Sequence, residues 1–137
     1  MTINVALAGA GAFGIKHLDA MSKIDDVRVV SVVGRTLEPT QEVAAKYGIG
    51  HVTTDLAESL ALDEVDAVVL ATPTQMHAAQ SIACLDAGKH VEVEIPLCDN
   101  LADGVRVVEA QRRTGLVAMC GHTRRVTGRQ LGVQFAR

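Results

Sequence analysis

The sequence predicts an α/β domain built around a doubly wound parallel sheet. Hydrophobic residues make up 48% of the 137 residues but aromatic residues only 2%, so the core must consist of small aliphatic side chains, as in buried parallel strands. Apolar runs of strand length alternate along the chain with segments of helical spacing. A glycine-rich turn joins the first such pair, and a chain of this length can bury one sizeable core as a single domain.

The glycine-rich turn, Gly9-Ala10-Gly11-Ala12-Phe13-Gly14, follows the apolar run 3–8 and opens a helical segment. In such a turn Gly9 permits the tight bend, Gly11 lets a pyrophosphate approach the backbone, and Gly14 lets helix and strand pack closely. The following helix directs free N–H groups at the phosphates. Glycines that serve packing alone are the alternative. The strand–turn–helix setting favours a Rossmann dinucleotide site.

The remaining elements follow in alternation. We expect strands at 27–33, 51–53, 67–71, 89–94 and 116–120. Helices are expected after the glycine turn, from Pro39 to Gly48, at 55–60, from His77 to Gly88, and from Asn100 to Gly115. Two apolar helix faces are expected to be buried, one in the first helix and one in the last: Ile15, Leu18 and Met21, and Leu101, Val105 and Val108.

The end of the second strand, Gly34-Arg35-Thr36, bears on the choice of cofactor. An NAD site usually places a carboxylate near this position, where it accepts hydrogen bonds from the adenosine ribose. Here a small residue and an arginine stand instead, which leaves room for a 2′-phosphate and supplies a cation to bind it. An arginine on a surface loop without such a role remains the alternative. The sequence favours NADP over NAD.

Two further loops lie where a doubly wound sheet binds its ligands, at the carboxyl ends of strands. Thr72-Pro73-Thr74 follows the most apolar strand, and Glu94 ends the strand at 89–94. We expect the first loop to line the ribose and nicotinamide. His77 is ambiguous, because capping or packing is as compatible with its position as contact with the cofactor.

Charge and cysteine content exclude several functions. Residues 1–109 hold 7 Lys and Arg against 16 Asp and Glu, whereas 110–137 hold six Arg and no acidic residue. This basic tail lacks interleaved aromatic residues, so we expect no nucleic-acid partner. We also expect no membrane partner, because neither a leader pattern nor an apolar run of bilayer length is present. The three cysteines suit neither a disulfide framework nor a metal site, and indicate reduced thiols in the cytoplasm.

Four motifs in order, G-A-G-A-F-G, T-P-T-Q-M-H-A, A-G-K-H-V-E-V-E-I-P and G-H-T-R-R, resemble the glucose–fructose oxidoreductase, inositol dehydrogenase and rhizopine catabolism family over roughly 3–125. The motifs are most similar to those of the branch that oxidises the cyclic hemiacetal of an aromatic ring-fission semialdehyde to a pyrone dicarboxylate with NADP. The resemblance implies contacts to the cofactor, with Ala12 and Phe13 over the pyrophosphate, Arg35 at the adenosine, Thr72 to Thr74 along the ribose, Glu94 near the nicotinamide, and Arg124 among the binding residues.

The sequence departs from this family in two respects. Ile95 stands where most members have the lysine that handles the substrate hydroxyl proton, a change that the semialdehyde branch shares. The family also continues into a second α+β domain, which carries its substrate-binding sheet and catalytic histidine. We therefore expect residues 1–122 to be a Rossmann domain and 123–137 a basic tail, the truncated start of the second domain.

The expected function is that of the NADP-binding domain of an oxidoreductase, which moves hydride between NADP and a hydroxyl or cyclic hemiacetal carbon of a small-molecule substrate. No catalytic residue is assigned, because the five histidines have no partner carboxylate at motif spacing. A nucleotide-binding module without turnover is the alternative, and the isolated chain is expected to bind cofactor but not to turn over substrate. A methyltransferase-like site is disfavoured by the T-P-T-x-x-H loop. A homo-oligomer remains open.

Overall fold

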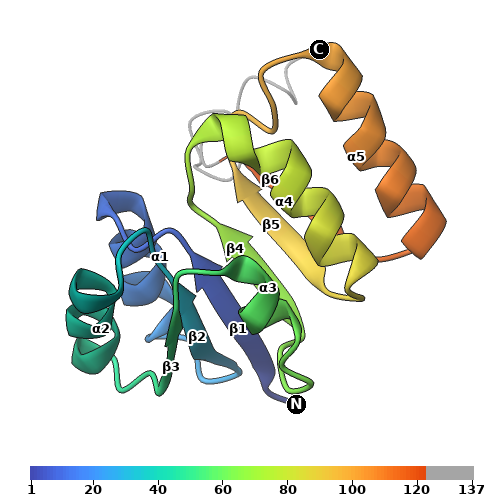
Figure 1. Cartoon of the computed structure of the whole chain (residues 1–137). Helices are drawn as coiled ribbons and strands as arrows, with labels where there is room; N and C mark the ends of the chain where they lie inside the picture. Colours follow the sequence, from blue (N-terminus) through green and yellow to red (C-terminus); the bar gives the residue numbers. More distant parts are fainter. Residues whose placement is uncertain (123–137) are drawn as a thin grey trace, which may run out of the picture.

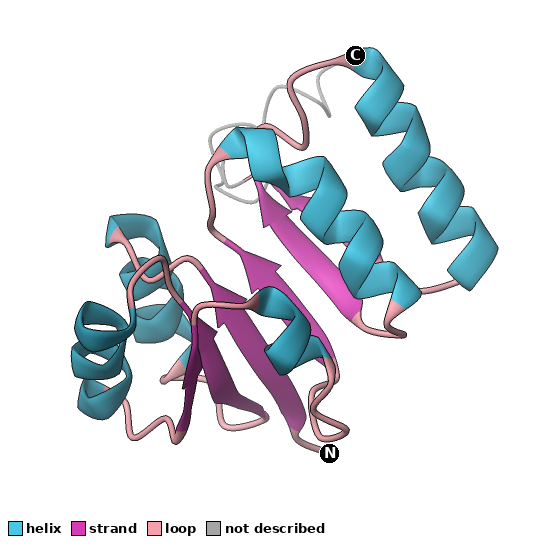
Figure 2. Cartoon of the chain, in the orientation of Figure 1, coloured by secondary structure: helices cyan, strands magenta, loops and turns pink. Residues whose placement is uncertain are grey.

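The computed structural model describes residues 1–122. They form one six-stranded, wholly parallel sheet in the order β3-β2-β1-β4-β5-β6. The strands are β1 (Ile3–Ala8), β2 (Val27–Val33), β3 (His51–Thr53), β4 (Ala67–Leu70), β5 (His90–Glu94) and β6 (Ala118–Gly121). The helices are α1 (Ala12–Met21), α2 (Leu37–Lys46), α3 (Leu56–Leu60), α4 (Thr74–Asp86) and α5 (Leu101–Thr114). Figures 1 and 2 show helices on both faces of the sheet. The predicted fold class is confirmed.

The strand order reverses beside β1. The chain runs outward from β1 through β2 to β3 and then returns to place β4 on the other side of β1. Ala8 pairs with both Val33 of β2 and Leu70 of β4, so these three strands end level with one another. In open parallel sheets, ligands bind in the crevice outside the carboxyl ends of the strands at such a reversal. The topology therefore fixes the place of the site.

The core lies in two layers, one on each face of the sheet. Alternate residues of a strand point to opposite faces, and in β1 Val5 and Leu7 pack with Leu18 of α1, while Ala6 and Ala8 pack with Leu85 of α4. Burial on both faces explains the near-continuous apolar runs of the strands. None of the helices within 1–122 is long and apolar enough to cross a bilayer.

Two of the expected helix faces need correction. Ile15 is 36% exposed, and α1 instead buries Gly14, Leu18 and Met21. The expected face of α5 is wrong: Leu101, Val105 and Val108 are exposed, and α5 buries Val107 and Ala110. Helix α5 lies beside α4 on the β5–β6 side of the sheet (Figure 1). It therefore needs only a narrow buried stripe, and the small Ala110 lets it approach the core cluster.

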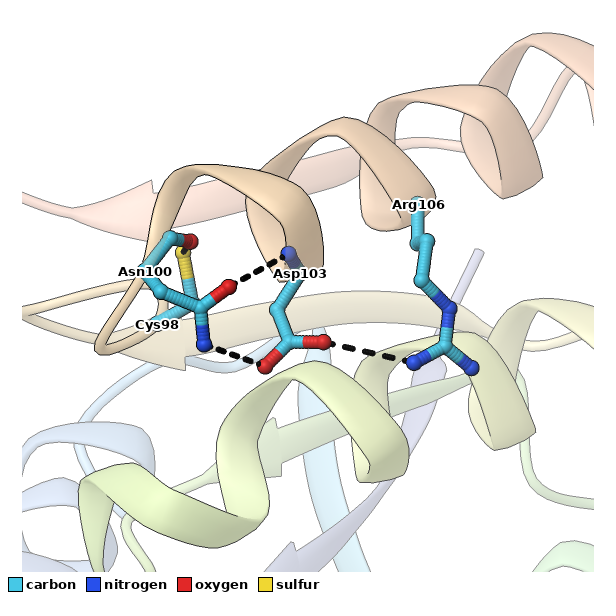
Figure 3. A network of polar contacts seen from close by, with 4 residues as sticks. All are labelled: Cys98, Asn100, Asp103 and Arg106. Carbon is cyan, nitrogen blue, oxygen red and sulfur yellow. Dashed lines mark hydrogen bonds and ion pairs between the residues drawn. The ribbon is translucent and has the colours of Figure 1, made fainter.

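The start of α5 is fixed by a reciprocal cap (Figure 3). The Oδ1 of Asn100 accepts from the N–H of Asp103 at 2.9 Å, and the Nδ2 of Asn100 donates to Oδ2 of Asp103 at 2.8 Å. Arg106 lies one turn further and contacts Oδ1 of Asp103 at 3.3 Å. Both side chains are exposed to solvent, which screens the ion pair, so it contributes little to stability. The Sγ of Cys98 donates to the carbonyl of Asn100.

We predict that Asn100→Ala lowers the free energy of unfolding by about 1 kcal/mol, because the N–H of Asp103 loses its acceptor. Arg106→Ala is the matched control and should change it by less than about 0.5 kcal/mol, since it removes only an exposed ion pair. Urea unfolding followed by circular dichroism measures both. Equal effects of the two substitutions would contradict the assignment of the cap to Asn100.

Candidate nucleotide-binding site

The glycine turn between β1 and α1 is shaped by two close backbone approaches. A Cβ on Gly14 would overlap the carbonyl oxygen of Gly9, and a Cβ on Gly9 would overlap the carbonyl oxygen of Ala71, which follows β4. Gly9 also has a φ of +103°, a conformation that L side chains rarely adopt. Gly9 and Gly14 are thus required for packing the turn against its neighbours.

Gly11 is different, because a Cβ built on it would meet nothing within 4 Å. It is the N-cap residue of α1, its φ is −80°, and no side chain caps the helix. The first N–H groups of α1 therefore face an open space, which is the arrangement that receives a phosphate at a helix N-terminus. Ala12 and Phe13 are exposed there, and the ammonium of Lys16 lies 5.1 Å from the centre of the Phe13 ring.

A cavity of about 590 Å³ opens beside this turn. Helix α1 forms one wall and the loops after β4 and β5 form the others. The lining residues are Phe13, Lys16, His17, Ala20, Ala71, Thr72, Pro73, Thr74, His77, Glu94 and Ile95. Six residues predicted for the cofactor site are among them: Phe13, Thr72, Pro73, Thr74, His77 and Glu94. The cavity that these residues line therefore lies beside the glycine turn, at the carboxyl edge of the sheet.

His77 ties the two loops of the cavity together. It is 2% exposed, its Nε2 lies 2.7 Å from the carbonyl oxygen of Thr72, and its Nδ1 lies 2.8 Å from the carbonyl oxygen of Pro96. The hydroxyl of Thr72 donates to the side chain of Gln80 at 2.6 Å, which fixes the same loop to α4. Of the alternatives for His77, the geometry favours packing, with the ring bracing the cavity wall.

The residues predicted for the adenosine end lie away from this cavity. Gly34 follows β2, and Arg35 and Thr36 are exposed. A side chain at Gly34 would overlap Thr40, a buried residue whose hydroxyl donates to the carbonyl of Thr36 at 2.6 Å. The glycine is therefore accounted for by the packing of α2. Thr36 is the N-cap residue of α2 and makes no side-chain cap, so its hydroxyl and Arg35 face solvent beside a helix N-terminus. Arg124 lies outside the described residues.

An acid–base pair that the sequence did not reveal lies within the cavity. Nε2 of His17 on α1 is 2.7 Å from Oε1 of Glu94 at the end of β5, and 25% and 19% of the two side chains are exposed. The expectation concerned carboxylates at motif spacing, and His17 finds its partner across the fold instead. The two residues are 77 positions apart, so no local spacing could have indicated the contact.

Glu92 stands two residues before Glu94 in β5, so its side chain points to the same face of the sheet. Its Oε2 is buried and finds no hydrogen-bond partner among the described residues. Burial raises the pKa of Glu92, with a smaller contribution from the charge of Glu94, while His17 and His77 oppose the rise. A Cβ on Gly121 of β6 would overlap Oε1 of Glu92, so the glycine makes room for this carboxyl group.

The residues present fit a dinucleotide. The uncapped N-terminus of α1 and the open space at Gly11 suit the pyrophosphate, since backbone N–H groups there bind anions. The polar and hydroxyl groups of the neighbouring cavity suit a ribose and a carboxamide ring. Within 1–122 no three His, Cys, Asp or Glu side chains are grouped as metal ligands.

Comparison with known proteins agrees with this geometry. Residues 3–122 match the family described as "Oxidoreductase family, NAD-binding Rossmann fold". The 4-carboxy-2-hydroxymuconate-6-semialdehyde dehydrogenase of Sphingobium sp. is 61% identical over 123 residues, covering 90% of this chain and 39% of the relative. The scyllo-inositol 2-dehydrogenase (NADP(+)) of Bacillus subtilis is 32% identical, with 85% and 36% of the two chains covered.

A solved structure leads to the same conclusion. GenD2 from gentamicin A biosynthesis, in complex with NAD, superposes with a TM-score of 0.83 at 31% identity and covers 87% of this chain and 34% of its own. This chain therefore spans between a third and two fifths of the length of these relatives. Because the family model matches nearly all of the described residues, the chain belongs to the glucose–fructose oxidoreductase, inositol dehydrogenase and rhizopine catabolism family, of which it contains the NAD(P)-binding Rossmann domain.

Proposed function

We propose that this chain is the cofactor-binding part of an NADP-dependent dehydrogenase that oxidises a hydroxyl or cyclic hemiacetal carbon. The observation that carries the proposal is the uncapped helix N-terminus at Gly11, which opens beside a cavity of about 590 Å³ at the reversal of the strand order. The bound nicotinamide supplies the hydride chemistry. The residues of this chain bind the phosphates, orient the ring and line the space beside it.

The preference for NADP rests on the adenosine end. Arg35 is exposed, makes no ion pair within 1–122, and follows a strand that ends without a carboxylate. A guanidinium binds a phosphate through charge-assisted hydrogen bonds. The nearby N-terminus of α2, where Thr36 leaves the backbone uncapped, adds a favourable field for an anion. These features together support the 2′-phosphate of NADP as the ligand of this corner.

The substrate class rests on similarity and on one residue. The relative that is 61% identical is a 4-carboxy-2-hydroxymuconate-6-semialdehyde dehydrogenase, which supports an aromatic ring-fission semialdehyde, in its cyclic hemiacetal form, as the substrate of the whole enzyme. Ile95 lines the cavity with half of its surface exposed, where most of the family has a lysine. An apolar residue there suits a flat, conjugated substrate better than a polyol, whose hydroxyl groups it would leave without partners.

We predict that Gly11→Val abolishes cofactor binding while the protein stays folded. The new Cβ meets no protein atom and the backbone is extended, but the branched side chain fills the space that the pyrophosphate needs. Each lost hydrogen bond to a charged group is worth about 1.5–3 kcal/mol, so the loss of affinity should reach at least about 100-fold. Titration of NADPH fluorescence measures it.

Gly14→Ala is the matched control for the same turn. Its Cβ would overlap the carbonyl of Gly9, so this substitution should lower the melting temperature of the protein. Gly11→Val should leave the melting temperature nearly unchanged. Overpacking of this kind destabilises by about 1–3 kcal/mol. Unimpaired NADPH binding by a folded Gly11→Val protein would refute the assignment of the pyrophosphate site.

We predict that Arg35→Ala weakens NADPH binding by about ten- to a hundredfold and leaves NADH binding nearly unchanged, because only NADPH carries the 2′-phosphate. Arg28→Ala is the control, since Arg28 is an exposed arginine at the opposite end of β2. It should affect neither cofactor. An equal loss for NADPH and NADH on replacing Arg35 would argue against NADP preference at this corner.

A further inference from the structure

The basic residues of this chain are placed unevenly about the sheet. Residues 1–109 hold 7 Lys and Arg against 16 Asp and Glu, although the cofactor that the family binds is itself an anion. Helices that connect parallel strands run back across the sheet, so helix ends and strand starts lie at its amino edge. Most of the seven lie at that edge or are already paired: Lys23 after α1, Arg28 at the start of β2, Lys46 at the end of α2, Lys89 before β5, and Arg106 in contact with Asp103. The two that stand at the carboxyl edge are Lys16 and Arg35.

Lys16 has no anionic partner among the described residues. It lies in the second turn of α1 and lines the cavity. Its ammonium is 5.1 Å from the centre of the Phe13 ring, and it makes no ion pair within 1–122. The carboxylate in the same cavity, that of Glu94, is engaged by His17 at 2.7 Å. The charge of Lys16 is therefore available to an anion that enters the cavity.

The contact with Phe13 directs the ammonium toward the start of α1. Side chains on a helix point back toward its N-terminus, and Phe13 is the second residue of α1. The same turn begins beside Gly11, where a Cβ would meet nothing within 4 Å. A cation–π attraction at an exposed ring such as that of Phe13 is weak, so it orients the ammonium without competing strongly against a phosphate.

We propose that Lys16 binds the diphosphate of the cofactor and that Phe13 is its positioning residue. The inference rests on the nucleotide-binding function proposed above. The N–H groups of α1 bind the diphosphate from the helix end, whereas Lys16 supplies a full positive charge from the cavity wall. An ammonium on a flexible stem suits this task, because it acts as a point charge and needs no fixed bidentate geometry.

The two cations at the carboxyl edge then have separate ligands, and the two cofactors distinguish them. NADPH and NADH share the diphosphate, but only NADPH carries the 2′-phosphate that we assign to Arg35. Removing the charge of Lys16 should therefore weaken both cofactors by the same factor, whereas removing that of Arg35 should weaken NADPH alone. Contacts to the cofactor from residues outside 1–122 would add to both affinities and would leave this contrast intact.

The experiment titrates the purified 137-residue chain with NADPH and with NADH, each followed by its fluorescence. Lys16→Met keeps an apolar stem but removes the charge, and we expect it to weaken both cofactors by about tenfold. Lys16→Arg keeps the charge and should retain most of the affinity. Lys23→Met is the matched control, because it changes the net charge equally at the far end of α1, and it should affect neither cofactor.

Salt and the ring of Phe13 provide two further readouts. The loss in Lys16→Met should shrink between about 0.1 M and about 1 M sodium chloride, because the Debye length falls from about 10 Å to about 3 Å. Phe13→Leu should weaken both cofactors by about two- to fivefold, and Phe13→Tyr, which keeps an aromatic face, should not. In a chain that already carries Lys16→Met, Phe13→Leu should have no further effect, because the ring acts through the ammonium.

Each other outcome counts against a stated part of the inference. Unchanged binding of both cofactors by Lys16→Met, an equal loss in Lys23→Met, or a loss confined to NADPH would overturn the diphosphate contact and leave the proposed function standing. An effect of Phe13→Leu that is equally large with and without Lys16 would overturn the positioning role of the ring. Failure of the unchanged chain to bind either cofactor would overturn the proposed function itself. Lys16 is exposed, so the melting temperature of Lys16→Met should match that of the unchanged chain.

Discussion

The mutual approach of Gly14 and the carbonyl of Gly9 is the constraint on which the site depends. It brings the first turn of α1 against the end of β1, and the contact of Gly9 with Ala71 brings the end of β4 to the same point. The three segments converge where the strand order reverses. Gly11 is left free of protein neighbours, so the open space that we propose for a pyrophosphate results from the tight packing of the two other glycines.

The fold was predictable because the central strands β1, β2 and β4 are largely buried and read as apolar runs. Strands β1, β2 and β3 have the predicted limits, and β4 and β5 differ by one residue. The order of motifs along the chain also placed Thr72, Thr74 and Glu94 at the ligand edge, since the carboxyl ends of parallel strands meet there. These inferences need only local pattern and the handedness of crossover connections.

The contacts between distant elements were not predictable. The pairing of His17 with Glu94 depends on how α1 lies across the sheet, and the room for Glu92 depends on the absence of a side chain at Gly121. The exposed face of α5 has a related cause. Its apolar residues repeat on more than one face of the helix, so periodicity alone could not choose Val107 and Ala110 over Leu101 and Val105.

His77 makes the two loops of the cavity into one mechanical unit. Its ring spans from the carbonyl of Thr72, after β4, to that of Pro96, after β5, and its burial prevents water from replacing either partner. The planar ring fixes the separation of the two carbonyl oxygens, so the two loops keep their relative position. The positions of Glu94 and Ile95, just before Pro96, are thus tied to the loop after β4 as well as to their own strand.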